Sequence, residues 1–150
     1  MSAVDDVDEL IEQLQLAAGE SVKRNPEPVK RLWSRREDVT LATPYGPPVR
    51  GWDKVAKTIE HAASLLRDGE FVGSEIVAKY VTAELAYVVQ LERAEAKVGG
   101  REDIAPIATR ATMIFRPEEG TWKIVHRHAD TIITAQPPRS MIQQKFIPGG

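Results

Sequence analysis

The sequence predicts an α+β fold, in which helices from the first half of the chain cover one face of an antiparallel sheet made by the second half. Two observations favour this class. Up to about residue 67 the apolar residues recur at helical spacing, and after Gly69 they fall in four segments rich in Val, Ile, Tyr and Thr, as is typical of strands. Helices that precede an antiparallel meander are expected to pack on one side of it.

The first half of the chain supplies the helices. The first helix has an apolar stripe and begins with Asp5 and Asp6, where the helix dipole stabilises anions. Asn25 is placed to cap a short second helix, and Gly69 to end the third in the left-handed conformation. We therefore expect helices at 4–23, 25–33 and 52–67, a short strand at 39–42 and a stiff Pro/Gly loop at 43–48.

The second half of the chain supplies the sheet. The expected strands are 70–81, 84–97, 104–116 and 121–134, joined by turns at 82–83, 99–100 and 117–120. Residues 1–135 are therefore expected to form a single domain. Residues 136–150 hold three prolines and two terminal glycines, which predicts an extended or disordered tail. The apolar residues of this tail that could dock on a partner are Met141, Ile142 and Phe146.

Composition excludes several classes of protein. The 150 residues carry a formal net charge of −2 with both signs spread along the chain, so neither nucleic acid nor a membrane is an expected partner. Cysteine is absent, which excludes disulfides and thiolate metal sites. The acidic N-terminus is unlike a secretory signal and no apolar run reaches the ~20 residues of a membrane span, so we expect a cytoplasmic protein. Because no phosphate-cradling loop or dinucleotide fingerprint is present, no cofactor is expected.

The most informative segment is the expected hairpin at 110–130, whose second arm ends in His-x-His-x-Asp. Side chains alternate faces along a strand, so His126, His128 and Asp130 are predicted to share a face with Trp122 and Ile124. The other face would carry two long cations, which belong in water. The tryptophan face is therefore predicted to point inward, as the wall of a pocket with an apolar end and a polar mouth.

These three polar residues are the candidate catalytic groups. Imidazole titrates near neutral pH, so His128 and His126 suit general acid–base catalysis, and Asp130 suits a general base. The alternatives are histidines hydrogen-bonded within a sheet and a strand-end carboxylate in water. A shared metal is not expected, because His126 and Asp130 would lie about 13 Å apart along the strand.

Five further residues are candidates for binding a ligand. Arg110 lies in an otherwise apolar stretch and needs an anionic partner, for which we predict Glu92 on the preceding strand. Arg110 would either hold a ligand carboxylate or form only a structural ion pair. Tyr45 in the stiff loop could donate to an oxyanion, and Trp33 and Trp52 are aromatics for the pocket rim, with ordinary core packing as the alternative.

Three segments carry a resemblance to a known family. They are R-G-W-D-K-V at 50–55, L-A-Y-V-V-Q-L-E-R at 85–93, and T-R-A-T-M-I-F-R-P-E-E-G-T-W-K-I-V-H-R-H-A-D at 109–130. Over roughly residues 4–134 the chain resembles the nuclear transport factor 2-like superfamily, in its SnoaL-like and ketosteroid isomerase-like forms. The resemblance implies a cone-shaped curved antiparallel sheet wrapped around N-terminal helices, a cystatin-like roll. That superfamily contains isomerases, dehydratases, cyclases, and modules that only bind or assemble.

The last segment is also similar to the association domain of the calmodulin-dependent kinase, in which arginines line the pocket. Arg110 matches one of these arginines, whereas Val89 and Ala129 fall where two others would be. The match would make Ala129 face the pocket, in conflict with strict alternation from Trp122. A β-bulge near 126–129 would reconcile the two interpretations.

Two functional hypotheses follow. The first is a cofactor-independent lyase, isomerase or cyclase that acts by acid–base chemistry on a small apolar ligand with a carbonyl or carboxylate. The alternative is a non-catalytic module for ligand binding or dimerisation. In both, we expect a homodimer through the outer face of the sheet, because helices cover only one face of it.

Overall fold

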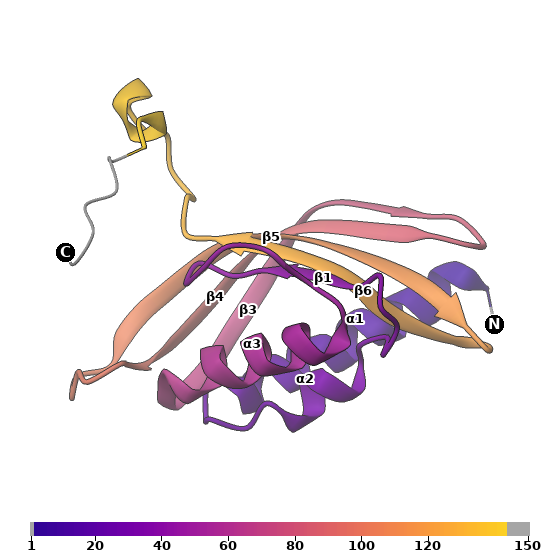
Figure 1. The fold of residues 1–150 in the computed structure, drawn as a ribbon, viewed down its shortest axis with the longest axis horizontal. Coiled ribbons are helices and arrows are strands. Elements are labelled where there is room, and N and C mark those ends of the chain that lie inside the picture. Colours follow the sequence, from indigo (N-terminus) through magenta and orange to yellow (C-terminus); the bar gives the residue numbers. More distant parts are fainter. Residues whose placement is uncertain (1, 144–150) are drawn as a thin grey trace.

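The computed structural model describes residues 2–143 and confirms the α+β prediction. Figure 1 shows α1 (Ala3–Ser21), α2 (Glu27–Arg31) and α3 (Trp52–Ser64) on one side of a single curved sheet. Helix α1 begins where the Ser2 hydroxyl accepts a hydrogen bond from the backbone N–H of Asp5, an N-cap that satisfies one of the free donors of the first turn. The helices therefore form one layer and the sheet the other.

The sheet has six strands in the order β2-β1-β6-β5-β4-β3. Neighbouring strands are antiparallel except β1 and β6, which run parallel. The two-residue strand β2 was not predicted, since it follows directly on the proline-rich loop. The strands are β1 (Thr40–Ala42), β2 (Val49–Arg50), β3 (Leu66–Val81), β4 (Ala86–Val98), β5 (Ala105–Glu118) and β6 (Thr121–Asp130).

Strand β3 is bent by irregularities in its pairing. Three register shifts interrupt its pairing with β4, and each extra residue bends and twists a strand. Gly69 lies at the first of them, within β3, so the prediction that it ends helix α3 is wrong. A Cβ on Gly69 would lie 2.7 Å from the Cβ of Val22 and 2.8 Å from that of Ala96. Glycine is needed there because the strand passes directly against the end of α1.

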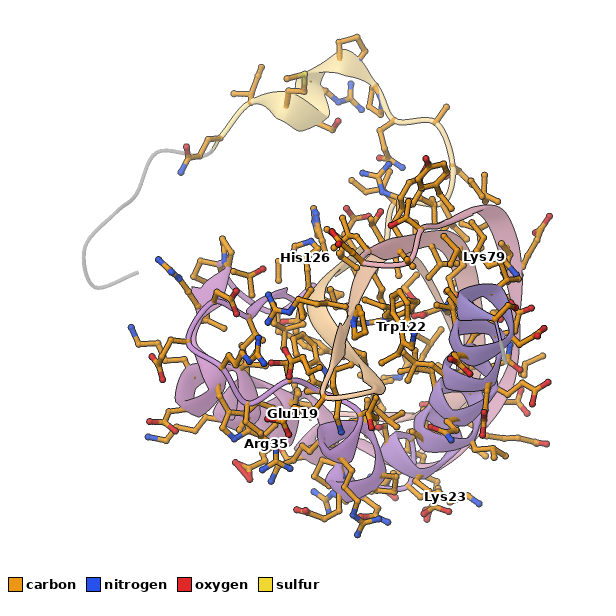
Figure 2. The ribbon with its side chains drawn as sticks, turned by 90° about the vertical axis from the view of Figure 1, so that its right-hand side faces the viewer. Lys23, Arg35, Lys79, Glu119, Trp122 and His126 are labelled. Atoms are coloured by element: carbon orange, nitrogen blue, oxygen red, sulfur yellow. The ribbon has the colours of Figure 1, made fainter. Side chains whose placement is uncertain are left out.

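The hydrophobic core fills one half of the space between the layers. It joins the first half of α1 to the hairpin end of β5 and β6, and Figure 2 shows Trp122 inside the ring of helices and strands. Trp33 is also fully buried and pairs with Ile124 as a parallel bridge, so the chain before β1 already follows β6. The core residues are Val7, Leu10, Ile11, Trp33, Val39, Leu41, Val55, Ile59, Ala86, Val88, Met113, Phe115, Trp122 and Ile124.

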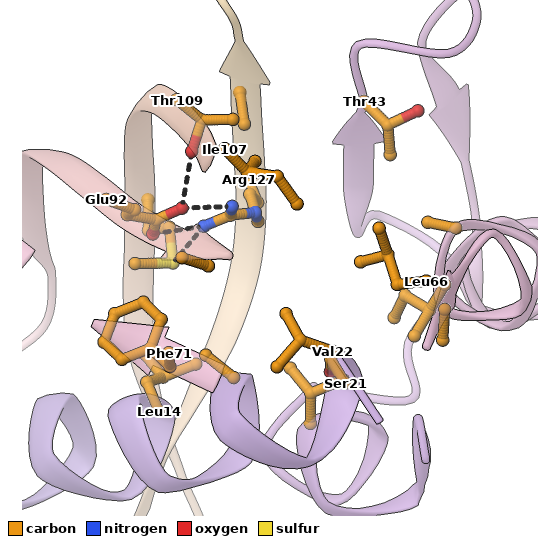
Figure 3. Close-up of a pocket in the computed structure, with 18 of the residues that line it drawn as sticks. Leu14, Ser21, Val22, Thr43, Leu66, Phe71, Glu92, Ile107, Thr109 and Arg127 are labelled. Atoms are coloured by element: carbon orange, nitrogen blue, oxygen red, sulfur yellow. Dashed lines mark hydrogen bonds and ion pairs between the residues drawn. The ribbon is translucent and has the colours of Figure 1, made fainter. Parts of the chain in front are cut away.

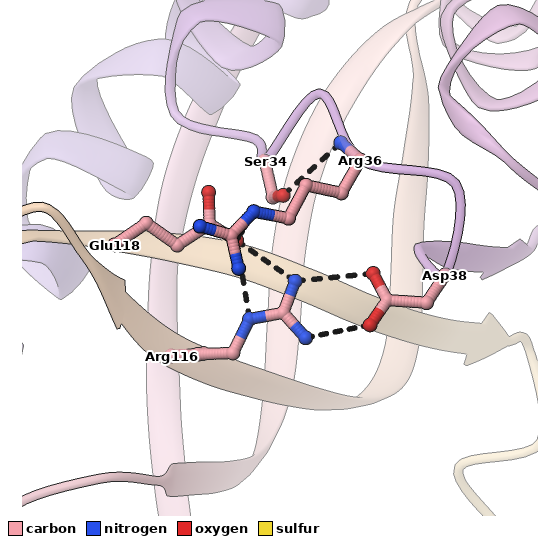
Figure 4. Close-up of polar contacts among 5 residues, drawn as sticks. All are labelled: Ser34, Arg36, Asp38, Arg116 and Glu118. Carbon is pink, nitrogen blue, oxygen red and sulfur yellow. Dashed lines mark hydrogen bonds and ion pairs between the residues drawn. The ribbon is translucent and has the colours of Figure 1, made fainter.

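A polar cluster fastens the segment before β1 to the sheet (Figure 4). The Arg116 guanidinium donates to both carboxylate oxygens of Asp38, at 2.7 and 3.1 Å, and to Glu118 at 2.8 Å. Because the hydrogen bonds to Asp38 are charge-assisted and bidentate, they fix the orientation of the loop as well as its position. They hold β1 in place beside β6.

Beyond β6, residues 131–137 run without regular structure, and Pro138–Met141 form one exposed 3-10 turn. Met141 and Ile142 are exposed, and Phe146 lies outside the described residues. None of the helices between residues 2 and 143 is both long and apolar enough to cross a bilayer.

We expect Gly69→Ala to destabilise the fold by about 1–3 kcal/mol, because the added methyl group overpacks the contact of β3 with Val22 and Ala96. The matched control is Gly100→Ala, where an added Cβ has nothing within 4 Å. Urea unfolding measures both free energies. Equal midpoints for the two variants would contradict the close approach.

Candidate functional site

A cavity of about 240 Å³ lies in the other half of the space between helices and sheet. Its floor is the second half of α1 with part of α3, and its roof is the inner face of β4, β5 and β6 (Figure 3). Most of the lining is apolar. The apolar residues include Leu14, Ala18, Val22, Val29, Leu41, Ile59, Leu66, Phe71, Ala94, Ile107, Met113, Ile124 and Ala129.

Glu92 is the centre of the polar part of the roof (Figure 3). Its carboxylate receives a bidentate pair of hydrogen bonds from Arg127, at 2.6 and 2.8 Å. The Gln90 amide nitrogen donates to it at 2.8 Å and the Thr109 hydroxyl at 3.1 Å. A carboxylate offers about four lone-pair positions, so these four hydrogen bonds saturate Glu92.

The pKa of Glu92 follows from this environment. Burial by itself raises the pKa of the carboxyl, but the charge and hydrogen bonds of Arg127, with those of Gln90 and Thr109, lower it to about 2. Glu92 is therefore ionised at all physiological pH values and is a poor proton acceptor.

Strand β6 contains a β-bulge that decides which residues face the cavity. Ile114 pairs with His126, while the next residue, Phe115, pairs with Ile124. Val125 is therefore the extra residue, and the alternation of faces shifts by one after it. The bulge that would reconcile the two interpretations of the sequence is present, one position before the predicted segment.

The bulge reverses the predicted facing of the strand end. Arg127 and Ala129 line the cavity, together with Ile124 before the bulge. His126, His128 and Asp130 do not line it, so the prediction that they share the face of Trp122 is wrong. The similarity to the kinase association domain implied that Ala129 faces the pocket, and in the structure Ala129 does line the cavity.

These three residues form a polar row with Arg110 on the outer face. Arg110 makes a bidentate pair with Asp130, at 2.7 and 3.1 Å, which lowers the pKa of that carboxyl. His126 Nδ1 lies 2.7 Å from the Thr40 hydroxyl on β1, and burial together with the neighbouring His128 lowers its pKa. The His128 side chain is 58 % exposed. Apart from His126, the row is accessible to solvent or to a partner.

The predicted ion pair of Glu92 with Arg110 is wrong, because Glu92 pairs with Arg127 and Arg110 with Asp130. Glu92 does pair with a cation, as predicted, but that cation is the partly buried Arg127. The sequence did contain a sign of this pairing. If Ala129 faces the pocket, then Arg127, two positions before it on the same strand, faces the pocket too.

Two of the three aromatic candidates line the cavity and the third does not. Trp33 and Tyr45 line the cavity, Trp33 as a buried wall and Tyr45 as a half-exposed residue of the loop. Trp52 is not in the lining. It lies at the start of α3, where the guanidinium of Arg35 is 4.3 Å from the centre of its ring. Among the described residues, no group of three or more His, Cys, Asp and Glu is arranged to hold a metal.

A curled open sheet over N-terminal helices, with a cavity between them, defines the nuclear transport factor 2-like class. Within it, the chain belongs to the SnoaL-like domain family, whose sequence profile matches residues 13–134. No curated protein matches the chain in a sequence search.

Solved structures agree on the fold. A nuclear transport factor 2-like superfamily protein from Salmonella enterica is 15 % identical, with a TM-score of 0.72 over 88 % of this chain and 92 % of that one. A ketosteroid isomerase-like protein from Erwinia carotovora atroseptica is 16 % identical, with a TM-score of 0.71 over 87 % and 96 %. An uncharacterized protein with a cystatin-like fold from Caulobacter vibrioides is 17 % identical, with a TM-score of 0.65 over 92 % and 93 %.

We expect Glu92→Leu to be more destabilising than Arg127→Met. Removing the carboxylate leaves the Arg127 charge unpaired in the cavity, at a cost of about 3 kcal/mol, whereas Glu92 without Arg127 can take up a proton. The double variant is expected to lie near the wild type, because neither charge remains. Thermal unfolding of the three variants measures this coupling, and additive effects would show that the two groups act independently.

The lowered pKa of Glu92 also predicts a dependence of stability on pH. Its folded-state pKa of about 2 lies below the ordinary value of 4.5, so its contribution is full above about pH 4.5 and is lost as the pH falls toward 2. The contribution is about 3 kcal/mol. The free energy of unfolding of wild type minus that of Glu92→Leu/Arg127→Met should therefore fall across this range. A difference that is constant with pH would contradict the assignment.

Proposed function

We propose that this protein binds a small, largely apolar molecule in the cavity and acts as a binding module. The observation that carries the proposal is the state of the polar roof. The ionisable groups of the lining are Glu92, Arg93, Arg127 and Tyr45, of which Glu92 is saturated and fully ionised. A site of this kind offers shape and fixed hydrogen bonds to a ligand.

The acid–base hypothesis receives less support from the geometry. A general acid or base must reach the substrate within hydrogen-bond distance and titrate near the working pH. His126 and His128 lie on the outer face, away from the cavity, and Glu92 faces the cavity but has a pKa of about 2. A lyase or isomerase of this chain would therefore have to carry out its chemistry with Tyr45 or on the outer face.

We propose further that the outer face is the surface of a homodimer, as the sequence predicts. Tyr80 and Tyr87 lie there with their rings stacked at 5.8 Å and are both exposed. The polar row of Arg110, His128 and Asp130 lies on the same face, further along the adjoining strands β5 and β6. An apolar patch rimmed by polar groups is typical of a protein interface, and a twofold axis would bring each patch onto its copy.

The binding proposal is tested by filling the cavity. Ala94 lines the cavity, so Ala94→Phe should remove the binding of 2-methoxynaphthalene, measured by calorimetry. Ala83→Phe, in the exposed turn between β3 and β4, is the matched control and should bind as the wild type does. Wild-type protein that does not bind this probe, or equal binding by both variants, would contradict an apolar site in this cavity.

We expect His128→Ala to leave the affinity for 2-methoxynaphthalene unchanged and to weaken the dimer, because the imidazole lies outside the cavity and is exposed on the outer face. Light scattering over a range of protein concentrations measures the dimer. A monomeric wild type would contradict the dimer. If His128→Ala loses probe binding while the dimer stays intact, His128 belongs to the ligand site and this prediction is wrong.

A further inference from the structure

Strand β6 ends earlier than the sequence predicts, and this leaves an open edge on its neighbour β5. The expected strand at 121–134 stops at Asp130. Residues 105–109 of β5 pair with β4 on one side, and no strand between residues 2 and 143 pairs with them on the other. Figure 1 shows the chain leaving the sheet there while β4 and β5 run on to their hairpin. The free N–H and C=O groups of such an edge are a template for a further strand.

The segment that follows Asp130 has the composition of a strand. Residues 131–134 read T-I-I-T, and all four are β-branched, which favours a pleated, half-buried surface. In the structure this segment has no regular conformation, and Ile132 and Ile133 are 40 % and 37 % exposed. A strand-forming segment therefore lies beside an edge that lacks a strand.

A local hydrogen bond turns this segment away from the sheet. The Oδ1 of Asp130 accepts from the backbone N–H of Ile132 at 2.9 Å, and Arg110 holds the same carboxylate through its bidentate pair. Side-chain hydrogen bonds of this kind compete with strand pairing for the backbone donor. Because the Arg110 side chain is exposed, the ion pair adds little stability. A modest gain in burial elsewhere can therefore outweigh the contacts that hold the segment open.

The register of β5 with β6 fixes where the segment would lie if it continued the strand. Arg110 pairs with Asp130, so in the same register Ala108 would pair with Ile132. The Asp130 side chain lies on the outer face. Alternation would then place Ile132 on the outer face and Ile133 on the inner face.

The inner face at this place is the cavity. Since β6 lies between β1 and β5, its continuation would lie between the segment that follows β1, residues 43–45, and Ile107 and Thr109 on β5. All of these residues line the cavity. The added strand would therefore cover the cavity and place Ile133 opposite Ile107. Pro106 has no N–H to donate, so pairing is expected to end near Ile133.

From the open edge of β5 and the register beside it, we propose that residues 131–133 are a strap, which adds to the end of β6 and closes the cavity over a bound ligand. The proposal rests on the cavity being a ligand site, as argued above, and adds how that site is closed. In the closed position Ile133 is buried against the ligand, so the ligand and the closed strap stabilise each other.

Engineered disulfides test the closed position directly, because the chain has no cysteine of its own. In Ala108→Cys/Ile132→Cys the two side chains would meet on the outer face, and neither residue lines the cavity. Ala108→Cys/Ile133→Cys is the matched control, since its second side chain would point to the opposite face. We expect the first variant to form a disulfide within one chain at least about tenfold faster than the control.

The ligand and Asp130 are expected to shift the strap in defined directions. Bound 2-methoxynaphthalene should speed disulfide formation in Ala108→Cys/Ile132→Cys, because it stabilises the closed position. Adding Asp130→Ala should speed it without the probe, since the hydrogen bond that turns the chain away is lost. The disulfide should slow release of the bound probe about tenfold relative to the same protein after reduction, measured by stopped-flow fluorescence.

The outcomes separate the two proposals. If the wild type binds no 2-methoxynaphthalene, the cavity is not a ligand site and both proposals fail. If the probe binds but the two cysteine pairs oxidise at equal rates, or the disulfide leaves the release rate unchanged, the site is retained and the strap is overturned. A disulfide that joins two chains would assign the open edge of β5 to a second copy, and closure within one chain would be wrong.

Discussion

The ion pair of Glu92 with Arg127 is the interaction on which the arrangement of the site depends. A carboxylate in the roof of an apolar cavity requires a cation on the same face of the sheet. Arg127 can meet it only because the bulge at Val125 turns that part of β6 over. The same turn directs His126, His128 and Asp130 to the outer face. The ion pair of Glu92 with Arg127 therefore goes together with a neutral polar cluster on the inner face and a row of polar residues on the outer face.

The two halves of each long strand contact different parts of the interior. In one half their inner residues pack the core, as Val88, Phe115 and Ile124 do. In the other half the inner residues line the cavity, as Glu92, Thr109 and Arg127 do. Helix α1 shows the same division, with Leu10 in the core and Leu14 and Val22 at the cavity. The cavity residues of these strands and of α1 therefore lie on elements whose other half is tightly packed, which holds their positions.

The sequence predicts the fold well and the site only in part, and the reasons are physical. Helices and strands repeat over many residues, so their periods are visible in the sequence. A bulge adds one residue without a visible change of composition. Every side chain after it in the strand is then assigned to the wrong face of the sheet. The rule that long cations face water placed Arg127 outside, because the sequence does not show that Glu92 lies diagonally across the sheet from it. Trp33, Tyr45 and Glu92 could be assigned to the cavity because no bulge on their own segments reverses them.

The saturated cluster also fixes the polar side chains of the cavity roof. Arg127, Thr109 and Gln90 all bind Glu92, so the carboxylate fixes three donors at once. Because Nε2 of Gln90 is one of those donors, the orientation of its amide is fixed. Side chains that are already oriented lose little conformational freedom when a neighbouring site is filled, so less free energy is spent on ordering them. In this cavity the ion pair presents no free charge, and it fixes the orientation of the polar side chains beside it.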